Sequence, residues 1–146
     1  MEKKKLKKKL LSHILKNGRK QISEKILTKS FKSIQKSQKK SHTEIVKLAI
    51  LNSTPMFRVI KLRNKRRKKK SIKEIPAFLS NYTYRTSWGL KYLIKTSTSK
   101  TSGVFSDQLK HEILLNATSE GNAVAFKNEL QKKALPKKKY FKHYRW

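Results

Sequence analysis

The sequence predicts a mainly α-helical fold, a six-helix bundle with one basic β-hairpin that protrudes between the third and fourth helices. Apolar residues recur at helical spacing in six segments, and the period changes to that of short strands only between residues 56 and 79. The length of 146 residues suits a single domain, residues 1–146. Within it we distinguish a basic helix start (1–9), the hairpin (56–79) and a C-terminal tail (137–146).

Apolar stripes predict the first three helices. The stripes are Leu6, Leu10, Leu11, Ile14 and Leu15, then Ile22, Ile26, Leu27, Phe31 and Ile34, then Ile45, Leu48, Ala49 and Leu51. Asn17-Gly18 ends the first helix, because these residues tolerate the left-handed conformation. Ser41 followed by Glu44 predicts a capping box for the third helix, which Pro55 closes. A targeting peptide is the alternative for the Lys-rich start, but its apolar pattern runs into the body of the chain, which favours a structural helix.

Two short segments then have the composition of strands. MFRVIKLR (56–63) and SIKEIPAFL (71–79) are rich in apolar and β-branched residues, and Pro76 makes the second an edge strand. The stretch RNKRRKKK between them carries seven positive charges in eight residues. This pattern predicts a hairpin with a long basic tip.

Helical spacing returns from Asn81 onward. Tyr84, Trp88 and Tyr92 lie on one line beside Leu90, Leu93 and Ile94, and TSTSKTS (96–102) reads as a polar linker. Phe105, Leu109, Ile113 and Ala117 mark a fifth helix that ends at Gly121, and Ala123, Phe126, Leu130 and Ala134 mark a sixth that Pro136 stops. We expect Tyr84 and Trp88 to pack in the core, whereas Tyr82 and Arg85 have side chains suited to stacking on bases or meeting phosphates.

The charge balance points to a polyanionic partner. Lys and Arg total 39 against 8 Asp and Glu, a formal net charge of +31, which a small globule carries only against strong self-repulsion. Nucleic acid is the first candidate and a membrane surface the second, although a mixed helix–hairpin pattern argues against a polybasic membrane peptide. The hydrophobic fraction of 36% predicts a small core under a basic coat.

Groups for catalysis or metal binding are not arranged in any recognisable constellation. The chain has no cysteine, no close carboxylate pair, no G-x-S-x-G elbow and no phosphate-cradling glycine loop. His111 beside Glu112 comes nearest to a metal site, but adjacent residues on a helix point about 100° apart, so an ordinary surface helix is the better interpretation. We therefore expect no enzyme activity, no cofactor and no metal.

Several stretches resemble, in order, the family of bacterial and mitochondrial small-subunit ribosomal protein seven. The stretches are LLSHILKNGRKQISEKIL, KLAILNSTPMFRVIKLR, IKEIPAFL, YRTSWGLKYLI, EGNAVAFKNEL and the ending HYRW. They cover about residues 10–146. The chain departs from the family pattern in three places: RNKRRKKK replaces paired glycines at the hairpin tip, TSTSKTS replaces an Arg-rich linker, and the basic N-terminal arm is short.

The resemblance implies a structural constituent of the small ribosomal subunit. Such a protein binds rRNA of the 3′ major (head) domain, nucleates head assembly, lies near the exit tRNA site and the mRNA path, and neighbours small-subunit proteins nine and eleven. The excess of Lys over Arg suggests an AT-rich coding sequence, so we expect the mitochondrial matrix, with a plastid or a bacterial cytoplasm as the alternatives. A histone-like DNA-compacting protein is the rival function.

The candidate RNA-binding residues come from three basic clusters, Lys3 to Lys9, Arg58 to Lys70 and Lys132 to Arg145, and from the start of the fourth helix. They are Lys4, Lys5, Lys8, Arg58, Lys61, Arg63, Arg66, Arg67, Lys68, Lys69, Lys70, Tyr82, Arg85, Lys91, Lys142, Tyr144, Arg145 and Trp146. In the tail, Tyr140 and Phe141 are expected to anchor the last turn. The four tail residues of the RNA-binding set, which are Lys142, Tyr144, Arg145 and Trp146, are expected to face rRNA.

Overall fold

The computed structural model describes residues 3–63, 72–99 and 103–140. Its elements, in chain order, are α1 (Lys3–Ile14), α2 (Lys20–Ser37), α3 (His42–Ser53), β1 (Phe57–Arg63), β2 (Ile72–Phe78), α4 (Tyr82–Ser99), α5 (Phe105–Ala117), α6 (Asn122–Ala134) and the 3₁₀ helix η1 (Leu135–Tyr140). The fold is therefore mainly helical, with six α-helices and one antiparallel hairpin between the third and fourth, which confirms the predicted fold class.

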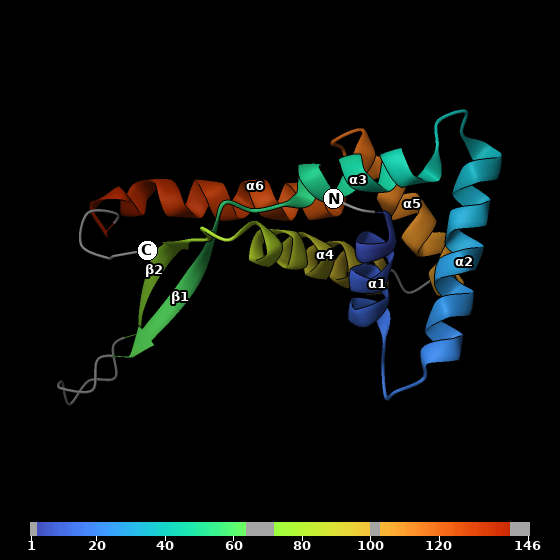
Figure 1. Ribbon diagram of the computed structural model, residues 1–146. Coiled ribbons are helices and arrows are strands. Elements are labelled where there is room, and N and C mark those ends of the chain that lie inside the picture. The colour runs from blue at the N-terminus through green and yellow to red at the C-terminus, as the bar shows by residue number, and fades with distance from the viewer. Residues whose placement is uncertain (1–2, 64–71, 100–102, 141–146) are drawn as a thin grey trace.

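The molecule is elongated, with the hairpin at one end and α2 at the other (Figure 1). Helices α4 and α6 run lengthwise, whereas α2 stands across the far end (Figure 1). One hydrophobic cluster joins all six helices, because α1 to α5 each contribute buried residues to it and α6 contributes Ala123. Leu27, Ile34, Leu109 and Ile113 are completely buried in this cluster. The buried apolar stripes of amphipathic helices thus hold the bundle together.

The first helix is structural, as the apolar pattern predicted. Leu6, Leu10 and Ile14 are buried against the bundle, while Lys7 and Lys8 stay exposed. Asn17 and Gly18 both adopt positive φ angles, of 51° and 71°, so the predicted Asn-Gly turn between α1 and α2 is confirmed.

The third helix differs from the prediction in two details. Leu48 and Leu51 are 43% and 53% exposed, and α3 instead buries Val46 and Ile50 beside Ile45 and Ala49. Helix α3 is apolar over most of its circumference, so the spacing alone does not fix its inner face. Ser41 is the N-cap residue, but its hydroxyl lies 2.9 Å from the Thr43 hydroxyl and makes no capping bond to the described backbone, so the predicted capping box is wrong.

The hairpin has the predicted strands. Strands β1 and β2 pair antiparallel with Phe57 opposite Phe78 and Arg63 opposite Ile72, and Pro76 opposes Val59. A two-stranded sheet has only edge strands, which is where proline is tolerated. The Phe57 and Phe78 rings meet edge to face with centroids 6.0 Å apart at the root of the hairpin. The predicted tip residues 64–70 lie outside the described residues.

Two predicted helix boundaries are wrong. Helix α4 continues through Thr96–Ser99, part of the expected polar linker, because these hydroxyls donate to carbonyl oxygens of the preceding turn: Thr96 to Tyr92 at 3.0 Å and Ser97 to Leu93 at 2.8 Å. Helix α5 ends at Ala117, and Gly121, predicted as its last residue, is the N-cap of α6. Pro136 follows the end of α6 as predicted, but the chain continues as η1.

The corner between α5 and α6 is closed by buried polar groups. Glu112 Oε1 accepts hydrogen bonds from the Ala123 N–H and from Asn116 Nδ2, both at 3.1 Å, and Asn116 Oδ1 accepts from the Val124 N–H at 3.3 Å. These bonds satisfy N–H groups that a helix N-terminus otherwise leaves open. A Cβ on Gly121 would lie 2.2 Å from Asn116 Oδ1, so only glycine fits here. The close approach of Asn116 at this corner therefore explains the glycine in the segment EGNAVAF.

Candidate nucleic-acid interface

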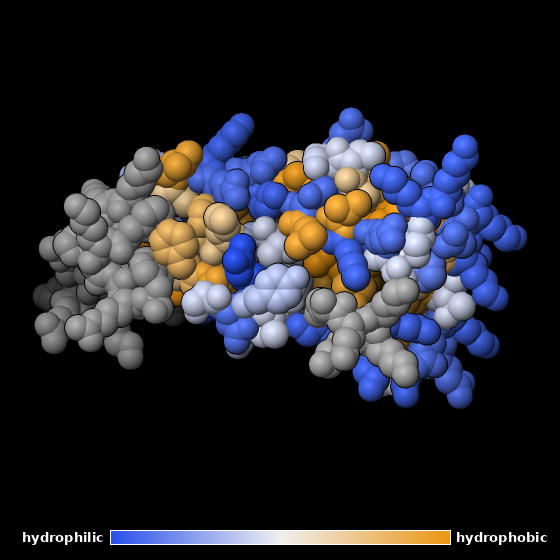
Figure 2. Space-filling model, turned by 45° about the horizontal axis from the view of Figure 1, so that its top comes forward, coloured by the Kyte–Doolittle hydropathy of each residue, from blue (hydrophilic) through white to orange (hydrophobic). Residues whose placement is uncertain are grey.

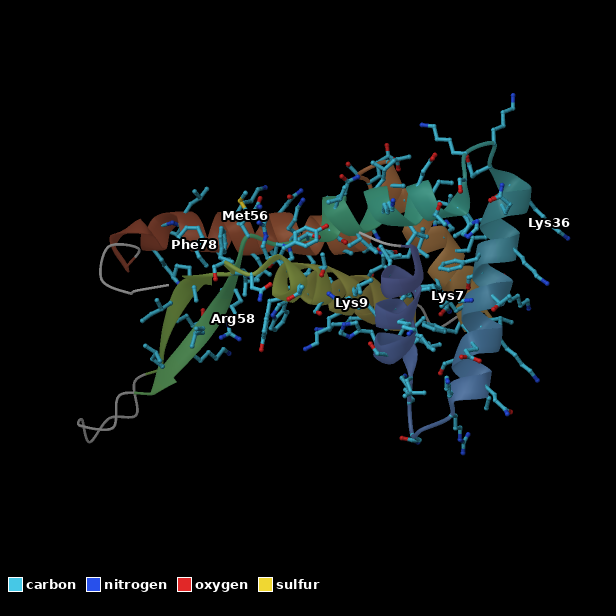
Figure 3. All side chains as sticks on the ribbon, viewed as in Figure 1. Lys7, Lys9, Lys36, Met56, Arg58 and Phe78 are labelled. Carbon is cyan, nitrogen blue, oxygen red and sulfur yellow. The ribbon has the colours of Figure 1, made fainter. Side chains whose placement is uncertain are left out.

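Cations of α1 and α4 meet where these two helices cross. Lys9 Nζ donates a hydrogen bond to Thr86 Oγ1 at 3.3 Å, which ties the charged face of α1 to α4. Burial, followed by the positive charges of Lys91 and Lys9, lowers the pKa of His13. The two ammonium groups thus act on the same imidazole, although they lie 82 residues apart in the sequence. Figure 3 shows Lys9 at the crossing of α1 and α4.

A groove of about 370 Å³ runs between β1, α4 and α6. Its lining residues are Arg58, Val59, Trp88, Lys91, Tyr92, Lys95, Phe126 and Leu130. Three aromatic rings form its wall in sequence: Trp88 and Tyr92 have centroids 5.9 Å apart, and Tyr92 meets Phe126 nearly edge-on at 4.9 Å. The groove therefore combines a continuous aromatic wall with three cationic side chains.

Two of the three groove cations lie close to its rings. Lys91 Nζ lies 4.9 Å from the centroid of the Trp88 ring, and Lys95 Nζ lies 5.5 Å from that of Phe126. Both distances are within the range of cation–π attraction. Stacking faces beside positive charge are what single-stranded nucleic acid requires, because bases stack on rings while phosphates meet cations.

The hairpin adds a second set of cations. Arg58 is half-buried, Lys61 is exposed, and the Lys61 ammonium lies 3.6 Å from the Glu74 carboxylate on the paired strand. A hydrogen bond and positive charge from Lys137, together with Lys61, lower the pKa of Glu74. Lys137 lies in η1, which directly follows α6, and its Nζ is 3.3 Å from Glu74 Oε2. This carboxylate therefore links the hairpin to the segment that follows α6.

Apolar surface also remains open on this molecule. Figure 2 shows hydrophobic patches set among hydrophilic side chains, one of them at the hairpin end. Met56 and Phe78, at the root of the hairpin, are 55% and 42% exposed. Figure 3 labels both at that root, next to α4 and α6.

The structure brings some of the predicted residues together and separates others. Arg58 and Lys91 line the same groove, and Lys8 lies on α1 one residue before the Lys9 contact with α4. Tyr82 begins α4 and is half exposed, and the Arg85 Nε is buried without a hydrogen-bond partner among the described residues. Lys4 and Lys5 lie in α1, and Arg63 ends β1.

The remaining predicted residues lie outside the described part of the chain. They are Arg66, Arg67, Lys68, Lys69 and Lys70 at the hairpin tip and Lys142, Tyr144, Arg145 and Trp146 in the tail. Phe141 also lies there, whereas Tyr140 is the last residue of η1.

Two expectations about aromatic residues had opposite outcomes. Trp88 is half-buried and packs on the hydrophobic cluster, as predicted, but Tyr84 is 60% exposed, so its predicted core position is wrong. The groove also contains Lys95 and Phe126, neither of which the sequence singled out as a binding residue. The spacing of Lys91 and Lys95, four residues apart on one helix face, was the signal that would have added Lys95.

The described residues include no group of three or more His, Cys, Asp or Glu that would hold a metal ion. No helix in the described part of the chain has both the length and the apolarity that crossing a bilayer requires.

Fold and surface together define a basic, mainly helical protein that presents cations and aromatic rings rather than a catalytic arrangement. The sequence matches the family described as "Ribosomal protein S7p/S5e" over residues 1–138, and the chain belongs to this family. It is therefore a structural protein of the small ribosomal subunit and not an enzyme.

Individual relatives agree with this assignment. A "Small ribosomal subunit protein uS7c" of Euglena gracilis is 31% identical over 126 residues, which cover 86% of this chain and 78% of that protein. The "Small ribosomal subunit protein uS7" of Heliobacterium modesticaldum is 30% identical and that of Thermotoga maritima 26% identical, each over 138 residues, 94% of this chain and 85% of the relative. The similarity thus extends over most of both chains and spans chloroplast and bacterial types.

Proposed function

We propose that this chain, folded as a single domain, binds small-subunit rRNA in the 3′ major (head) domain and nucleates head assembly. In this proposal it lies near the exit tRNA site and the mRNA path during translation. The observation that carries the proposal is the family match over residues 1–138 in a chain whose α4 and hairpin cations line one aromatic groove. The helix start, the hairpin and the tail supply its basic contacts.

The described geometry supports a division of labour in RNA binding. Lys8, Lys61 and Lys91 are exposed and neutralise phosphates, the sequence-independent source of affinity. Trp88, half-buried at the groove wall, favours unpaired bases that stack on its ring. Arg58 carries a planar guanidinium, which binds phosphate in a bidentate manner. In this proposal the basic residues of the hairpin tip and the tail contact tRNA and mRNA.

The proposed location of the chain rests on its composition, and its proposed neighbours on its family. We place the chain in the mitochondrial matrix, within the small subunit of the mitochondrial ribosome, on the strength of its Lys-rich composition. Because the relatives are of chloroplast and bacterial type, a plastid and a bacterial cytoplasm are the alternative locations. Its proposed protein neighbours are the equivalents of small-subunit proteins nine and eleven.

A competition assay tests the proposed function. The full chain is bound to a fluorescent head-domain rRNA fragment and challenged with unlabelled rRNA fragment or with duplex DNA of equal phosphate number. We expect the rRNA fragment to compete at much lower concentration, because folded RNA offers unpaired bases as well as phosphates. Equal competition by duplex DNA supports the DNA-compacting alternative and overturns the proposal.

Sedimentation provides a second test in the native setting. The protein is expected to migrate with small subunits isolated from mitochondria through a high-salt gradient. Complete loss of the protein from subunits with intact rRNA contradicts a role in the assembled head.

A further inference from the structure

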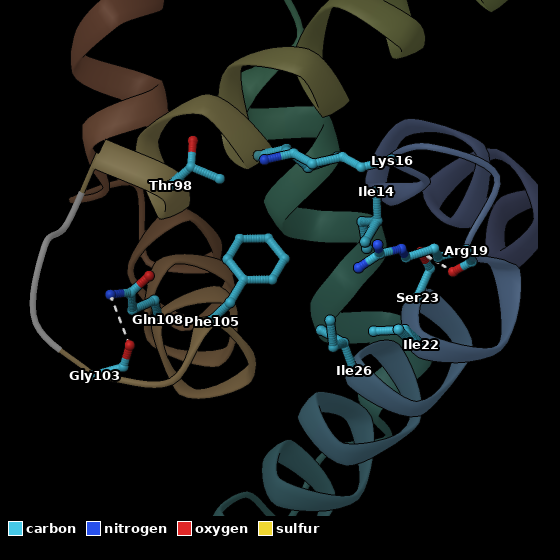
Figure 4. A pocket seen from close by; sticks show the side chains of 11 residues that line it. Ile14, Lys16, Arg19, Ile22, Ser23, Ile26, Thr98, Gly103, Phe105 and Gln108 are labelled. Atoms are coloured by element: carbon cyan, nitrogen blue, oxygen red, sulfur yellow. Dashed lines mark hydrogen bonds between the residues drawn. The ribbon is translucent and has the colours of Figure 1, made fainter.

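A second cavity, of about 480 Å³, lies beside α2, which is at the end of the molecule away from the hairpin (Figure 1). Figure 4 shows its lining residues from close by. The α1–α2 turn, α2, the C-terminal part of α4 and the start of α5 enclose it. Its lining residues are Ile14, Lys16, Arg19, Ile22, Ser23, Ile26, Ile94, Thr98, Gly103, Phe105 and Gln108. It shares no residue with the groove at the hairpin, which uses a different face of α4.

The interior of this cavity is apolar and contains an aromatic ring. Phe105, the first residue of α5, is half-buried and directs its ring into the cavity between α4 and α2 (Figure 4). Four isoleucines, Ile14, Ile22, Ile26 and Ile94, supply the rest of the apolar lining, and Ser23, Thr98 and Gln108 add uncharged polar side chains. Ile22 is 51% exposed, so apolar surface that the bundle has not covered faces solvent here.

Two cations stand at the mouth of the cavity. Lys16 and Arg19, both exposed, come from the turn between α1 and α2, and Figure 4 shows their side chains extending toward the cavity. No carboxylate occurs among the lining residues. The uncompensated positive charge selects an anionic ligand, and the apolar interior selects a ligand with an uncharged, flat part.

We propose that this cavity binds an unpaired nucleotide of single-stranded RNA. The base enters the cavity and contacts the Phe105 ring and the isoleucine side chains, while Lys16 and Arg19 hold the flanking phosphates. This inference rests on the proposed function, because it names a further RNA site on the same protein. Stacking on an aromatic ring beside cations is the usual way in which proteins hold a base taken out of a helix.

The size and the chemistry of the cavity favour a nucleotide over an acidic peptide. Its volume lies in the range of sites that enclose small ligands, about 300–1,000 Å³. Phe105 offers a ring face, which matches the π-face of any base, and the guanidinium of Arg19 binds phosphate in a planar, bidentate manner. Bases within a duplex stay stacked and cannot enter, so the cavity discriminates single strands from duplexes.

Methyl NMR of the full chain reports directly on this cavity, because four isoleucines line it. The Ile δ1 methyls are followed while a ten-nucleotide single-stranded RNA or a blunt RNA duplex of equal phosphate number is added. We expect saturable upfield ring-current shifts of the Ile14, Ile22, Ile26 and Ile94 methyls with the single strand only. Ile34 and Ile113, completely buried elsewhere in the bundle, serve as internal controls and stay in place.

Variants separate base stacking from charge. Phe105→Leu keeps an apolar side chain and is expected to weaken single-strand binding by about 5- to 150-fold, the value of one stacked base. Lys16→Gln/Arg19→Gln is expected to reduce the slope of log affinity against log salt by about 1.4, for two phosphate contacts at about 0.7 each. Lys29→Gln/Lys32→Gln removes the same charge from the exposed face of α2 and should leave the methyl shifts at saturation unchanged.

Three outcomes overturn the nucleotide site. The four methyls stay in place at saturating single-stranded RNA, or the duplex shifts them equally, or a Glu-rich peptide with a large apolar residue shifts them and RNA does not. Each of these leaves binding of the head-domain rRNA fragment intact if the proposed function is right, so the two failures are distinguishable. A chain that does not prefer this fragment over duplex DNA contradicts the proposed function instead.

Discussion

At the scale of single residues, Glu112 is the polar group on which the α5–α6 corner depends. It is completely buried, and its Oε1 accepts from the Ala123 N–H and from Asn116 Nδ2. Glu112→Ala should lower the free energy of unfolding by about 1–3 kcal/mol, because a buried N–H of α6 loses its partner. The measurement is urea unfolding followed by far-UV CD.

The neighbouring residue offers a matched control for this change. His111 is exposed on the same turn of α5, so His111→Ala should change the free energy of unfolding by no more than about 0.5 kcal/mol. Equal midpoints for the two variants contradict a structural role for the Glu112 carboxylate.

His13 gives the stability a dependence on pH. Burial, then Lys91 and Lys9, hold its pKa in the folded protein below the ordinary value of 6.5. The unfolded chain therefore binds a proton at His13 more readily than the folded chain does, and the stability is lost progressively as pH falls below about 6.5. His13→Gln should flatten the rise in stability between pH 5 and pH 7, measured by thermal unfolding at a series of pH values.

The slope of stability against pH in the unaltered chain serves as the reference. An unchanged slope in the His13→Gln variant rules out His13 as the group responsible.

Apolar periodicity predicted single residues only where position along a helix and depth in the bundle agree. Tyr84, Trp88 and Tyr92 share one line on α4, yet exposure falls from 60% at Tyr84 to 7% at Tyr92, because α4 enters the bundle as it proceeds. The same approach missed Glu112, since a charged residue reads as surface until its partners from α6 are known. The helical spacing of apolar residues does not show how deeply each residue is buried or which tertiary partners it has.

At the scale of elements, the six helices and the two strands were predictable because each carries a strong local signal. Pro55, Pro76 and Asn17-Gly18 marked boundaries or edges correctly, since their backbone preferences act locally. The errors lie where side chains overrule a weak local preference. Ser97 is completely buried within α4, although a Ser/Thr-rich stretch favours a linker, because its hydroxyl donates to the Leu93 carbonyl.

In the hairpin, the residues that stabilise the fold differ from those that we expect to bind RNA. Strands β1 and β2 pair over residues 57–63 and 72–78, and the Phe57–Phe78 contact lies at the root, far along the strands from the tip. Replacing Arg66 to Lys70 with Ser should therefore leave the far-UV CD spectrum unchanged, because this stretch has no apolar residue to bury. It should weaken binding to small-subunit rRNA and reduce its salt dependence, measured by titration at several salt concentrations.

A control substitution within the same hairpin tests the reasoning. Phe57→Ala removes the ring contact at the root and should lower stability while leaving the tip charges in place. Collapse of the CD spectrum in the five-Ser variant contradicts the assignment of residues 66–70 to a tip outside the core.

At the scale of the whole molecule, the sequence predicted the amount of positive charge but not its arrangement. The cluster 3–9, the hairpin and α4 are far apart in sequence, and only the fold places Arg58 beside Lys91 and Lys91 near His13. The groove itself needs Phe126 from α6, which no local motif connects to Trp88. Tertiary packing, not composition, thus turns a basic chain into a defined surface.

This arrangement predicts that equal losses of charge have unequal effects on RNA binding. Lys8→Gln/Lys61→Gln/Lys91→Gln removes three exposed cations from α1, the hairpin and α4. If each meets one phosphate, the slope of log affinity against log salt should fall by about 2–3 for a head-domain rRNA fragment. Gln has nearly the helix propensity of Lys, so the two helices should stay folded.

The matched control removes three cations from α2, at the end of the molecule away from the hairpin (Figure 1). Lys29, Lys32 and Lys36 lie exposed on α2, and Figure 3 shows Lys36 projecting away from the hairpin. Lys29→Gln/Lys32→Gln/Lys36→Gln gives the same net charge as the first variant. If binding depends only on net charge, the slope of log affinity against log salt should fall equally in both variants. A localised interface predicts a much smaller loss in the α2 variant. Titrations of both variants at about 50–300 mM salt, a range over which screening of surface charges strengthens, distinguish the two possibilities. Equal slopes contradict a binding face built from α1, α4 and the hairpin.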